Sequence, residues 1–564
     1  MSLPLIAGAF LVLLALGYRF YGAFVARRLA LDDSRPTPAH TRRDGTDFEP
    51  TKPFYLFGQH FSAIAAAGPI AGPILACDAF GWLPCLLWIG FGVVFVGAVH
   101  DFASLAGSVR HDASSVAQIA SRWLGPSAGR AMMAFIWIAL VYVIVAFTDM
   151  TAAAFVSGTD ELEAAGRTFN PGGAVAAASV MYLGVAVAMG LVGRWLAPPL
   201  WISTVVFVPL AFGAAWAGTW VSHLLVLDHA GWTLLIVGYC VVASLTPVRY
   251  LLQPRGYLGG FILYAAIGAG VLGIFFGGHA VVQPAFKTWD TGGFAGALFP
   301  FLFVTIACGA CSGFHGLVCS GTTSKQIDRE SHCRPVGFGA MLAEAFVALI
   351  ALATVMIATS DAVRGVAPGK IYGEGIGRFL TLVVGEENLA VATTFGAMAF
   401  STFVFDTLDV AMRLGRYLVQ ELTGLRGRAG ALAATLVTAL PPALVLTAAG
   451  SGGWRSFWTL FGASNQLLAA LTLVALTVWF RRTGRSGWFT AIPSAFVLVI
   501  TVWALGAIVW AQGRRSSGFD AAAFNAAAAA ALLALAGYVA LAAVRALRAK
   551  PSPSTEAPPI SRGA

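Results

Sequence analysis

Charged side chains are scarce in this chain. Asp, Glu, Lys and Arg make up 11% of its 564 residues, whereas soluble domains carry about 25%. Hydrophobic residues make up 58%, and the mean hydropathy is +0.78. The apolar runs are too long, and alternate too rarely, for the strands of a membrane β-barrel. The composition therefore excludes a soluble globular protein and predicts an all-α polytopic membrane protein.

Motifs of ATP-driven pumps and of common enzymes are missing as well. The sequence contains no GxxxxGK[ST] phosphate loop, no HExxH and no GxSxG. No segment longer than about thirty residues has the composition of a soluble domain. We therefore expect neither an enzyme nor a cofactor. Channel filters are usually symmetric and repeated, whereas this long chain is asymmetric. A channel, or an intramembrane enzyme, is therefore the more distant alternative.

The seven cysteines and the basic excess indicate no further chemistry. Most cysteines fall in apolar runs, where cysteine packs as a small apolar side chain. Cys308 and Cys311 have CxxC spacing, but no second pair accompanies them, so no metal site is predicted. The net charge of +9 arises from short loops between spans, so we expect contact with the lipid bilayer and no nucleic acid partner.

About fifteen apolar runs are long enough to cross a bilayer. The first run lacks a basic leading region and is predicted to be a retained helix rather than a cleaved signal. The segment 371–384 is amphipathic and could lie on the surface or form a re-entrant piece. The predicted spans begin near Leu3, Phe61, Trp82, Arg130, Gly172, Pro198, Gly231, Tyr257, Gly296, Pro335, Asn388, Gly430, Phe457, Trp488 and Ala521.

Basic residues predict the orientation of these spans. With the N-terminus outside, 26 of the 35 Lys and Arg residues fall in inner loops, 8 in outer loops and Arg19 in the first span. Cytoplasmic loops carry the excess of positive charge. We therefore predict an N-terminus outside and a C-terminus inside.

Two apolar runs contain residues that interrupt helices. In the first, Gly68-Pro-Ile-Ala-Gly-Pro73, prolines remove backbone donors and glycines expose the backbone. We expect this run to open for about one turn, although a kink that only shapes packing is the alternative. The second is the glycine-interrupted run 308–315. Open backbone in a membrane must be buried by protein or face a watery cavity, and transporters bind substrate and coupling ions at such breaks.

Polar residues at and near these breaks are candidates for substrate contact. Main-chain amides at Gly68 and Gly72 could face an anionic carboxylate. His60 could instead form only an interfacial hydrogen bond, and Asn465 and Gln466 could bind substrate or join helices. The predicted substrate-binding residues are His60, Ser62, Gly68, Pro69, Gly72, Pro73, Ser312, Gly313, His315, Asn465 and Gln466.

Carboxylates within spans are candidates for proton coupling, because an intramembrane charge is expensive. Glu344 lies among apolar neighbours and is the leading proton carrier. Asp149 is the second candidate, with a structural hydrogen bond as the alternative. Burial favours the protonated form of both.

Two further pairs lie near the predicted inner ends of spans. Asp409 and Arg413 are four residues apart, so we expect them to share a helix face and form an ion pair, either structural or gating. His100 and Asp101 are adjacent and are expected to point to different sides of a helix. A solvated pair at a helix end is the alternative to a coupling role for Asp101.

Six ordered segments resemble the peptide transporter carbon starvation family. They begin in the loop from Thr37 through Gln59-His60-Phe61 and end at Phe461-Gly-Ala-Ser-Asn-Gln-Leu467, so they cover most of the chain. The other four are GPIAGP at 68–73, GAVHDF at 97–102, SGFH at 312–315 with SGTTSK at 320–325, and TLD at 407–409 with RLGRY at 413–417.

The resemblance implies a secondary transporter of the bacterial cytoplasmic (inner) membrane. It implies uptake of a small carboxylate, pyruvate first, together with protons during carbon starvation; peptide or amino-acid uptake, possibly coupled to Na⁺, is the alternative. The implied fold is of the amino-acid–polyamine–cation type, like the leucine transporter, with inverted repeats and discontinuous helices. The expected organisation is a first helix and the start of a loop at 1–36, a transporter core at 37–470, C-terminal helices at 471–550 and a disordered tail at 551–564. No oligomeric state is predicted.

Overall fold

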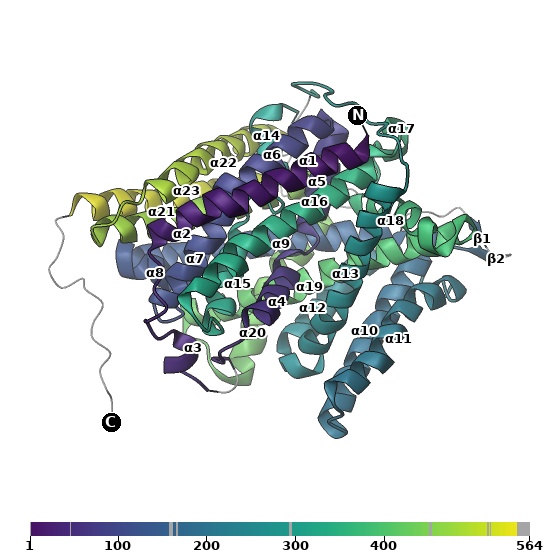
Figure 1. Cartoon of the computed structure of the whole chain (residues 1–564), viewed down its shortest axis with the longest axis horizontal. Helices are drawn as coiled ribbons and strands as arrows, with labels where there is room; N and C mark the ends of the chain where they lie inside the picture. Colours follow the sequence, from purple (N-terminus) through teal and green to yellow (C-terminus); the bar gives the residue numbers. More distant parts are fainter. Residues whose placement is uncertain are drawn as a thin grey trace.

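The computed structural model describes residues 2–44, 47–156, 162–164, 167–292, 296–449, 454–515, 518 and 520–549. Across these residues the chain is helical apart from a small antiparallel hairpin (Figure 1). Its strands β1 (Leu162–Ala164) and β2 (Arg167–Phe169) pair with Leu162 opposite Phe169. The predicted all-helical class is confirmed, and the predicted tail 551–564 lies outside the described residues.

Twenty-three α-helices are assigned in the described part of the chain. In order they are α1 (Leu3–Leu16), α2 (Ala23–Leu29), α3 (Pro38–Thr41), α4 (Pro53–Ile64), α5 (Gly68–Phe80), α6 (Trp82–Gly92), α7 (Ala98–Arg110), α8 (Val116–Leu124), α9 (Pro126–Val156), α10 (Pro171–Trp195), α11 (Leu200–Trp220), α12 (His229–Leu245), α13 (Leu252–Phe276), α14 (Leu298–Thr305), α15 (Gly313–Gly321), α16 (Ala340–Met356), α17 (Ser360–Val363), α18 (Pro368–Val384), α19 (Leu389–Thr423), α20 (Gly427–Ala449), α21 (Trp454–Arg482), α22 (Trp488–Arg515) and α23 (Ala521–Arg548). Three π-helical turns continue these helices. The turn η1 (Gly17–Gly22) joins α1 to α2, η2 (Val93–Gly97) joins α6 to α7, and η6 (Arg334–Gly339) precedes α16.

Twelve helices within the described residues are long and apolar enough to cross a membrane, and the bent pair α4–α5 would make thirteen. The protein is therefore a multi-pass membrane protein. The two remaining predicted runs are α12, which is a shorter apolar helix, and the pair α14 and α15, which have 8 and 9 residues. A total of fifteen crossings stays a prediction, because it counts these shorter elements as spans.

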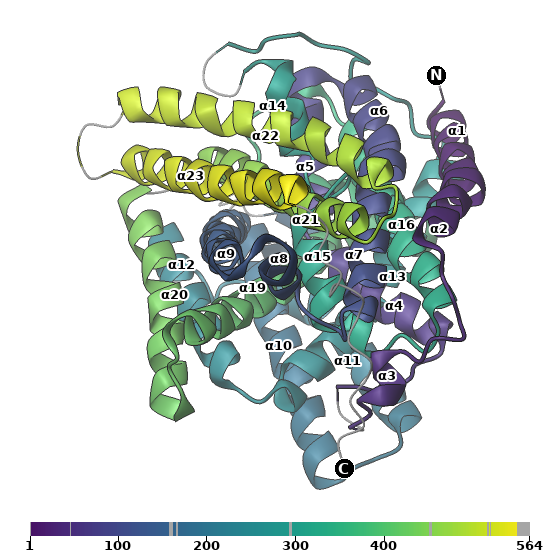
Figure 2. The same ribbon diagram turned by 90° about the vertical axis from the view of Figure 1, so that its left-hand side faces the viewer.

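Burial separates a central group of helices from a peripheral one. In the spans formed by α21 and by η6–α16, 89% and 83% of the apolar window is buried. The corresponding shares are 28% for α11 and for α23 and 33% for the first span, α1–η1–α2. Figure 1 shows the helix pair α10–α11 at one edge of the molecule, and Figure 2 shows α1–α2 at another edge. The less buried helices expose apolar side chains such as Leu5, Trp201 and Val205, as lipid-facing helices do.

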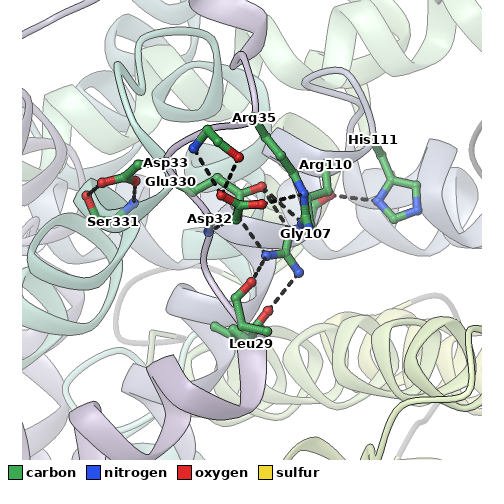
Figure 3. Close-up of polar contacts among 11 residues, drawn as sticks. Leu29, Asp32, Asp33, Arg35, Gly107, Arg110, His111, Glu330 and Ser331 are labelled. Carbon is green, nitrogen blue, oxygen red and sulfur yellow. Dashed lines mark hydrogen bonds and ion pairs between the residues drawn. The ribbon is translucent and has the colours of Figure 1, made fainter. Parts of the chain in front are cut away.

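A buried ion pair joins three segments at one end of the helices (Figure 3). Arg110, the last residue of α7, donates from Nε and Nη2 to the two carboxylate oxygens of Glu330 at 3.0 and 2.7 Å. The same guanidinium donates to the carbonyl oxygens of Leu29 and Ala30, each at 2.8 Å. Glu330 also accepts from the main-chain nitrogen of Asp32 at 2.9 Å. This group, called here the Glu330 cluster, ties the end of the first span to α7 and to the segment before α16.

Candidate functional site

The two interrupted segments, α4–α5 and α14–α15, lie antiparallel. At one end, the main-chain nitrogen of Thr51, before α4, donates to the carbonyl of Gln326, after α15, at 3.1 Å. At the other end, the nitrogen of Lys287, before α14, donates to the carbonyl of Phe80, the last residue of α5, at 3.0 Å. Because the start of each segment meets the end of the other, the two run in opposite directions.

The first interruption lies at residues 65–67, ahead of its predicted place at 68–73. Helix α4 ends at Ile64, α5 begins at Gly68, and the two helices are bent by 47°. Proline lacks the N–H that would bond the carbonyl four residues earlier, and its ring clashes with that carbonyl. For Pro69 that carbonyl belongs to Ala65, so the helix breaks on the N-terminal side of the proline. Pro69 occupies the first turn of α5, where proline is tolerated, and Pro73 lies inside the helix.

The second interruption, residues 306–312, separates α14 from α15. Side chains from neighbouring helices satisfy the carbonyls at the end of α14. The indole N–H of Trp88 donates to Ile306 O at 3.1 Å, that of Trp458 donates to Thr305 O at 3.0 Å, and Gln466 donates to Phe303 O at 2.9 Å. These bonds fill the acceptor positions that every helix end leaves open.

Asn465 holds the beginning of α15. Its Oδ1 accepts from the main-chain nitrogen of Phe314 at 2.9 Å, and its Nδ2 donates to Ser312 Oγ at 3.1 Å and to Cys308 Sγ at 3.3 Å. Gly313 packs against the carbonyl of Asn465, since a Cβ there would lie 2.4 Å from that oxygen. The structure therefore brings Asn465, Ser312 and Gly313 together at the second interruption.

Glycines let the two segments touch. A Cβ at Gly68 would lie 2.4 Å from Cys308 Sγ, and one at Gly72 would lie 2.6 Å from the carbonyl oxygen of Thr305. Both distances are too short for a real side chain, so only glycine allows this backbone approach. GPIAGP thus supplies a contact surface for the second segment as well as the proline that ends α4.

A small cavity lies between the interruptions. Its volume is about 20 Å³, enough for roughly one water molecule and too small for an organic substrate. Gly68, Pro69 and His315 are the predicted substrate-binding residues that reach it. The full lining is Ile64, Ala66, Gly68, Pro69, Val143, Phe147, Cys308, Phe314, His315, Thr407 and Phe461.

A continuous chain of buried ionisable side chains begins at this cavity. His315 Nε2 lies 3.3 Å from Glu344 Oε2 on α16, and His315 Nδ1 lies 2.9 Å from Asp101 Oδ2 on α7. The other carboxylate oxygen of Asp101 lies 2.7 Å from His100 Nδ1. All four side chains are at most 1% exposed. We call His100, Asp101, His315 and Glu344 the His315 relay.

The relay corrects the expectation for His100 and Asp101. Their side chains bond to each other instead of pointing to different sides of α7, and both are fully buried rather than solvated. The alternating directions of neighbouring helical residues are outweighed here because both side chains curl toward α15, where Gly316 leaves room for the imidazole of His100.

His60 and Ser62, both on α4, have different surroundings. His60 is buried, and its Nδ1 lies 2.9 Å from the hydroxyl of Thr323, while its Nε2 lies 3.9 Å from Cys319 Sγ. Cys319 in turn donates to the carbonyl of Asp101 at 3.5 Å, so His60 is one residue removed from the relay. Ser62 is partly exposed and faces Gly260 on α13, away from the cavity lining.

Asp409 pairs with an arginine from a different helix. Arg255, in the first turn of α13, is 1% exposed and donates to Asp409 Oδ2. The same guanidinium lies 2.6 Å from Asp406 Oδ1, and Tyr239 donates to Asp409 at 2.8 Å. The predicted pair with Arg413 is wrong, because that guanidinium donates to the carbonyls at 243 and 246. Asp406 and Asp409 are two carboxylates three residues apart in one span, and such a pair requires a nearby cation. This requirement could have predicted a partner such as Arg255.

Asp149 also has a partner that sequence reasoning missed. Its carboxylate is fully buried in α9, and its Oδ1 lies 2.9 Å from Nε2 of His229, the first residue of α12. His229 is thus a charge partner for Asp149, but neither oxygen of this carboxylate has a well-formed hydrogen bond within the described residues, so the structural hydrogen bond stays a prediction. No local pattern links two residues on helices this far apart in sequence.

The sequence of this chain matches a known family of membrane proteins. The family model described as carbon starvation protein CstA matches residues 2–374 and 360–504. The chain belongs to the carbon starvation protein CstA family. The family resemblance inferred from the motifs is thereby confirmed, and with it the function of a membrane transporter for a small molecule.

Individual relatives extend over most of the chain. The peptide transporter CstA of Helicobacter pylori strain J99 is 34% identical over 561 residues, covering 87% of this chain and 79% of its own length. The pyruvate/proton symporter BtsT of Escherichia coli K12 is 30% identical over 594 residues, covering 89% and 81%. A manganese transporter of Eremococcus coleocola has 14% sequence identity with a TM-score of 0.43, covering 87% of this chain and 95% of its own; a likeness at that level supports no further conclusion.

Proposed function

We propose that this CstA-family transporter imports a small carboxylate, pyruvate first, together with protons, and that the His315 relay carries the coupling proton. The observation behind this proposal is that His315 reaches the cavity between the interruptions and lies between two carboxylates, 2.9 Å from Asp101 and 3.3 Å from Glu344. The 30% identity with a pyruvate/proton symporter supports the choice of substrate and ion.

Charge balance explains why the relay suits proton coupling. The relay buries two carboxylates and two imidazoles, and among the described residues no group forms a good hydrogen bond with either oxygen of Glu344. An unsatisfied buried carboxylate is expensive while it is charged. A proton on Glu344 removes that charge, and an anionic substrate bound beside His315 would then enter a site without excess negative charge.

Substrate binding would require the side chains that line the cavity to move apart, because the cavity has room for only about one water. Gly68, Pro69 and His315 are the proposed direct contacts. The remaining candidates, His60, Ser62, Gly72, Pro73, Ser312, Gly313, Asn465 and Gln466, are proposed to shape the site. Asp101, Asp149 and Asp409 are the secondary proton-coupling candidates.

The antiparallel interruptions also support the inverted-repeat architecture, since repeats of inverted topology place their broken helices in opposite directions. We propose the bacterial cytoplasmic membrane as the location, with fifteen crossings, the N-terminus outside, the C-terminus inside and the Glu330 cluster on the cytoplasmic side. Residues 37–470 would form the transporter core.

Counterflow and accumulation in proteoliposomes test the function. Labelled pyruvate and a labelled dipeptide are offered separately, and pH and Na⁺ gradients are imposed one at a time. We expect pyruvate to accumulate when the outside is acidic and to ignore the Na⁺ gradient. Because several relatives are named peptide transporters, accumulation of the dipeptide alone would assign this chain the alternative substrate. A response to Na⁺ alone would remove the proton from the proposal.

A variant at Glu344 tests the relay. Glu344→Gln imitates the protonated carboxyl, so we expect it to lose pH-driven accumulation yet retain substrate exchange at equal pH. Glu374→Gln is the matched control, since Glu374 is a partly buried carboxylate on α18 whose charged neighbours are Lys370 and Arg378. Full pH-driven accumulation by Glu344→Gln would make Glu344 structural, and Asp149→Asn and Asp409→Asn would then be tested in turn.

A further inference from the structure

A basic groove lies beside the end of the first span, away from the transport site. Its volume is about 410 Å³, and it is open to the surroundings. It lies between α2 and the first turn of η6. Its lining is Ala23, Ala26, Arg27, Ala30, Leu31 and Arg334.

Small side chains create this groove. Ala23 and Ala26 are three residues apart on α2 and share a face with Arg27. Helix α2 ends at Leu29, and the residue that follows, Ala30, has a left-handed φ of 50°. The lining of the groove thus combines small or aliphatic side chains with two arginines, Arg27 and Arg334.

Both arginines lack an acidic partner among the described residues. No carboxylate lies within 4.0 Å of either one there, whereas Arg110 nearby is paired with Glu330. Arg334 donates from Nη2 to the carbonyl of Tyr18 at 2.7 Å. Its guanidinium carbon also lies 4.6 Å from the centre of the Tyr18 ring. Its Nε is buried and has no hydrogen-bond partner in the part of the chain that the structure describes. A buried charged donor of this kind calls for an acceptor.

In the proposed orientation, this end of the first span lies at the cytoplasmic surface of the membrane, where lipid headgroups lie. The first span forms an outer face of the protein here, because Leu16 and Phe20, which precede the groove in the same span, are 49% and 64% exposed. Acyl chains could follow these residues while the headgroup lies beside Arg27. Basic pockets between membrane helices on the cytoplasmic side bind anionic headgroups.

We propose that this groove binds one anionic phospholipid of the phosphatidylglycerol type, with its phosphate between Arg27 and Arg334. The phosphate oxygens would accept hydrogen bonds from both guanidinium groups. The glycerol would occupy the depression over Ala23 and Ala26. This inference rests on the proposed orientation and is independent of the proposed substrate and coupling ion.

Lipid titration of the purified full-length protein in detergent tests the proposal. The readouts are the number of phosphatidylglycerol molecules retained in native mass spectrometry and the thermal midpoint, measured in each variant with phosphatidylglycerol and with phosphatidylcholine. We expect the wild type to retain one more phosphatidylglycerol than the variant Arg27→Gln/Arg334→Gln, whose midpoint should not distinguish the two lipids.

Arg28→Gln is the matched control. Arg28 is the next residue along α2, but it stacks on Phe24 and Trp488 outside the groove, so its loss should leave the retained lipid unchanged. If Arg334→Gln prevents folding, Arg27→Gln alone and Ala26→Phe, which fills the groove without changing its charge, should each weaken retention. Equal retention by the groove variants and the wild type, equal loss in Arg28→Gln, or a midpoint shift reproduced by inorganic phosphate alone would overturn the proposal.

Discussion

Breaking the Glu330 cluster should destabilise the protein far more than breaking an exposed pair of the same geometry. Arg110 and Glu330 form a two-pronged pair whose side chains are 8% and 4% exposed. Arg43 and Glu49 also form a two-pronged pair, with bonds of 2.9 and 2.5 Å, but they are 62% and 41% exposed. The two pairs share their two-pronged geometry and differ in burial and in the main-chain bonds that Arg110 and Glu330 also form.

The expected magnitudes follow from that difference. Glu330→Gln leaves the Arg110 guanidinium buried beside a neutral amide, and removing one partner of a buried pair costs about 3–5 kcal/mol. Glu49→Gln should cost about 0–1 kcal/mol, because water screens and solvates the exposed arginine. Replacing both members of the buried pair, with Arg110→Gln added to Glu330→Gln, should recover part of the loss, since no uncompensated charge then remains.

Unfolding by sodium dodecyl sulfate in mixed micelles provides the assay. The seven cysteines are free and buried, so their labelling by a thiol reagent reports unfolding. The free energies of unfolding of the two glutamine variants are compared with that of the wild type. A difference between the variants of less than about 1 kcal/mol would refute the assignment of Glu330 and Arg110 as a buried pair that stabilises the fold.

Three further predictions concern single side chains. The pKa of Asp33 lies below its ordinary value of 3.8 because Ser331 donates main-chain and side-chain hydrogen bonds to it. A lowered carboxyl pKa stabilises the fold above the unfolded pKa, so Ser331→Ala, which removes the side-chain bond, should lower the free energy of unfolding near neutral pH. This loss should shrink as the pH falls below about 4, and unfolding measured across that pH range checks it. Gly72→Val would drive a Cβ to within 2.6 Å of a main-chain carbonyl and should lower the free energy of unfolding by about 1–3 kcal/mol or more, whereas an unchanged value would mean that the two segments separate without cost. Pro69→Ala should lengthen α4 into residues 65–67 and reduce uptake in proteoliposomes, while Pro73→Ala, inside a formed helix, should alter uptake less; the reverse order would place the break elsewhere.

Hydropathy and proline chemistry predict much of this fold. Every predicted run coincides with helical structure, because length and apolar content are local properties. The position of the first break was misjudged by one turn, since the effect of Pro69 falls on Ala65, a residue that looks helical in its own context. The total number of crossings is the least determined feature, because α12 and the pair α14–α15 are too short for a criterion based on length.

The candidate site could be predicted in its parts but not in its connections. Glu344 and His315 were identified separately because ionisable groups in apolar runs are rare, yet their contact depends on how α15 packs against α16. Arg255 and His229 were missed for the same reason. Each lies near the start of a helix, where a basic residue resembles an ordinary loop charge, and its buried position follows only from its partner on a distant helix.

The antiparallel contact of the two interrupted segments also bears on how the chain is assembled during synthesis. His60, in the first segment, and its partner Thr323, beyond the second, are 263 residues apart. At ordinary elongation rates of about 5–20 residues per second, the ribosome needs roughly 10–50 s to make the intervening chain. Throughout that interval the open turn at 65–67 lacks the segment that will cover it, and lipid does not satisfy exposed backbone groups. The nascent first segment must therefore be held at the insertion machinery, or at the water interface, until α14 and α15 emerge.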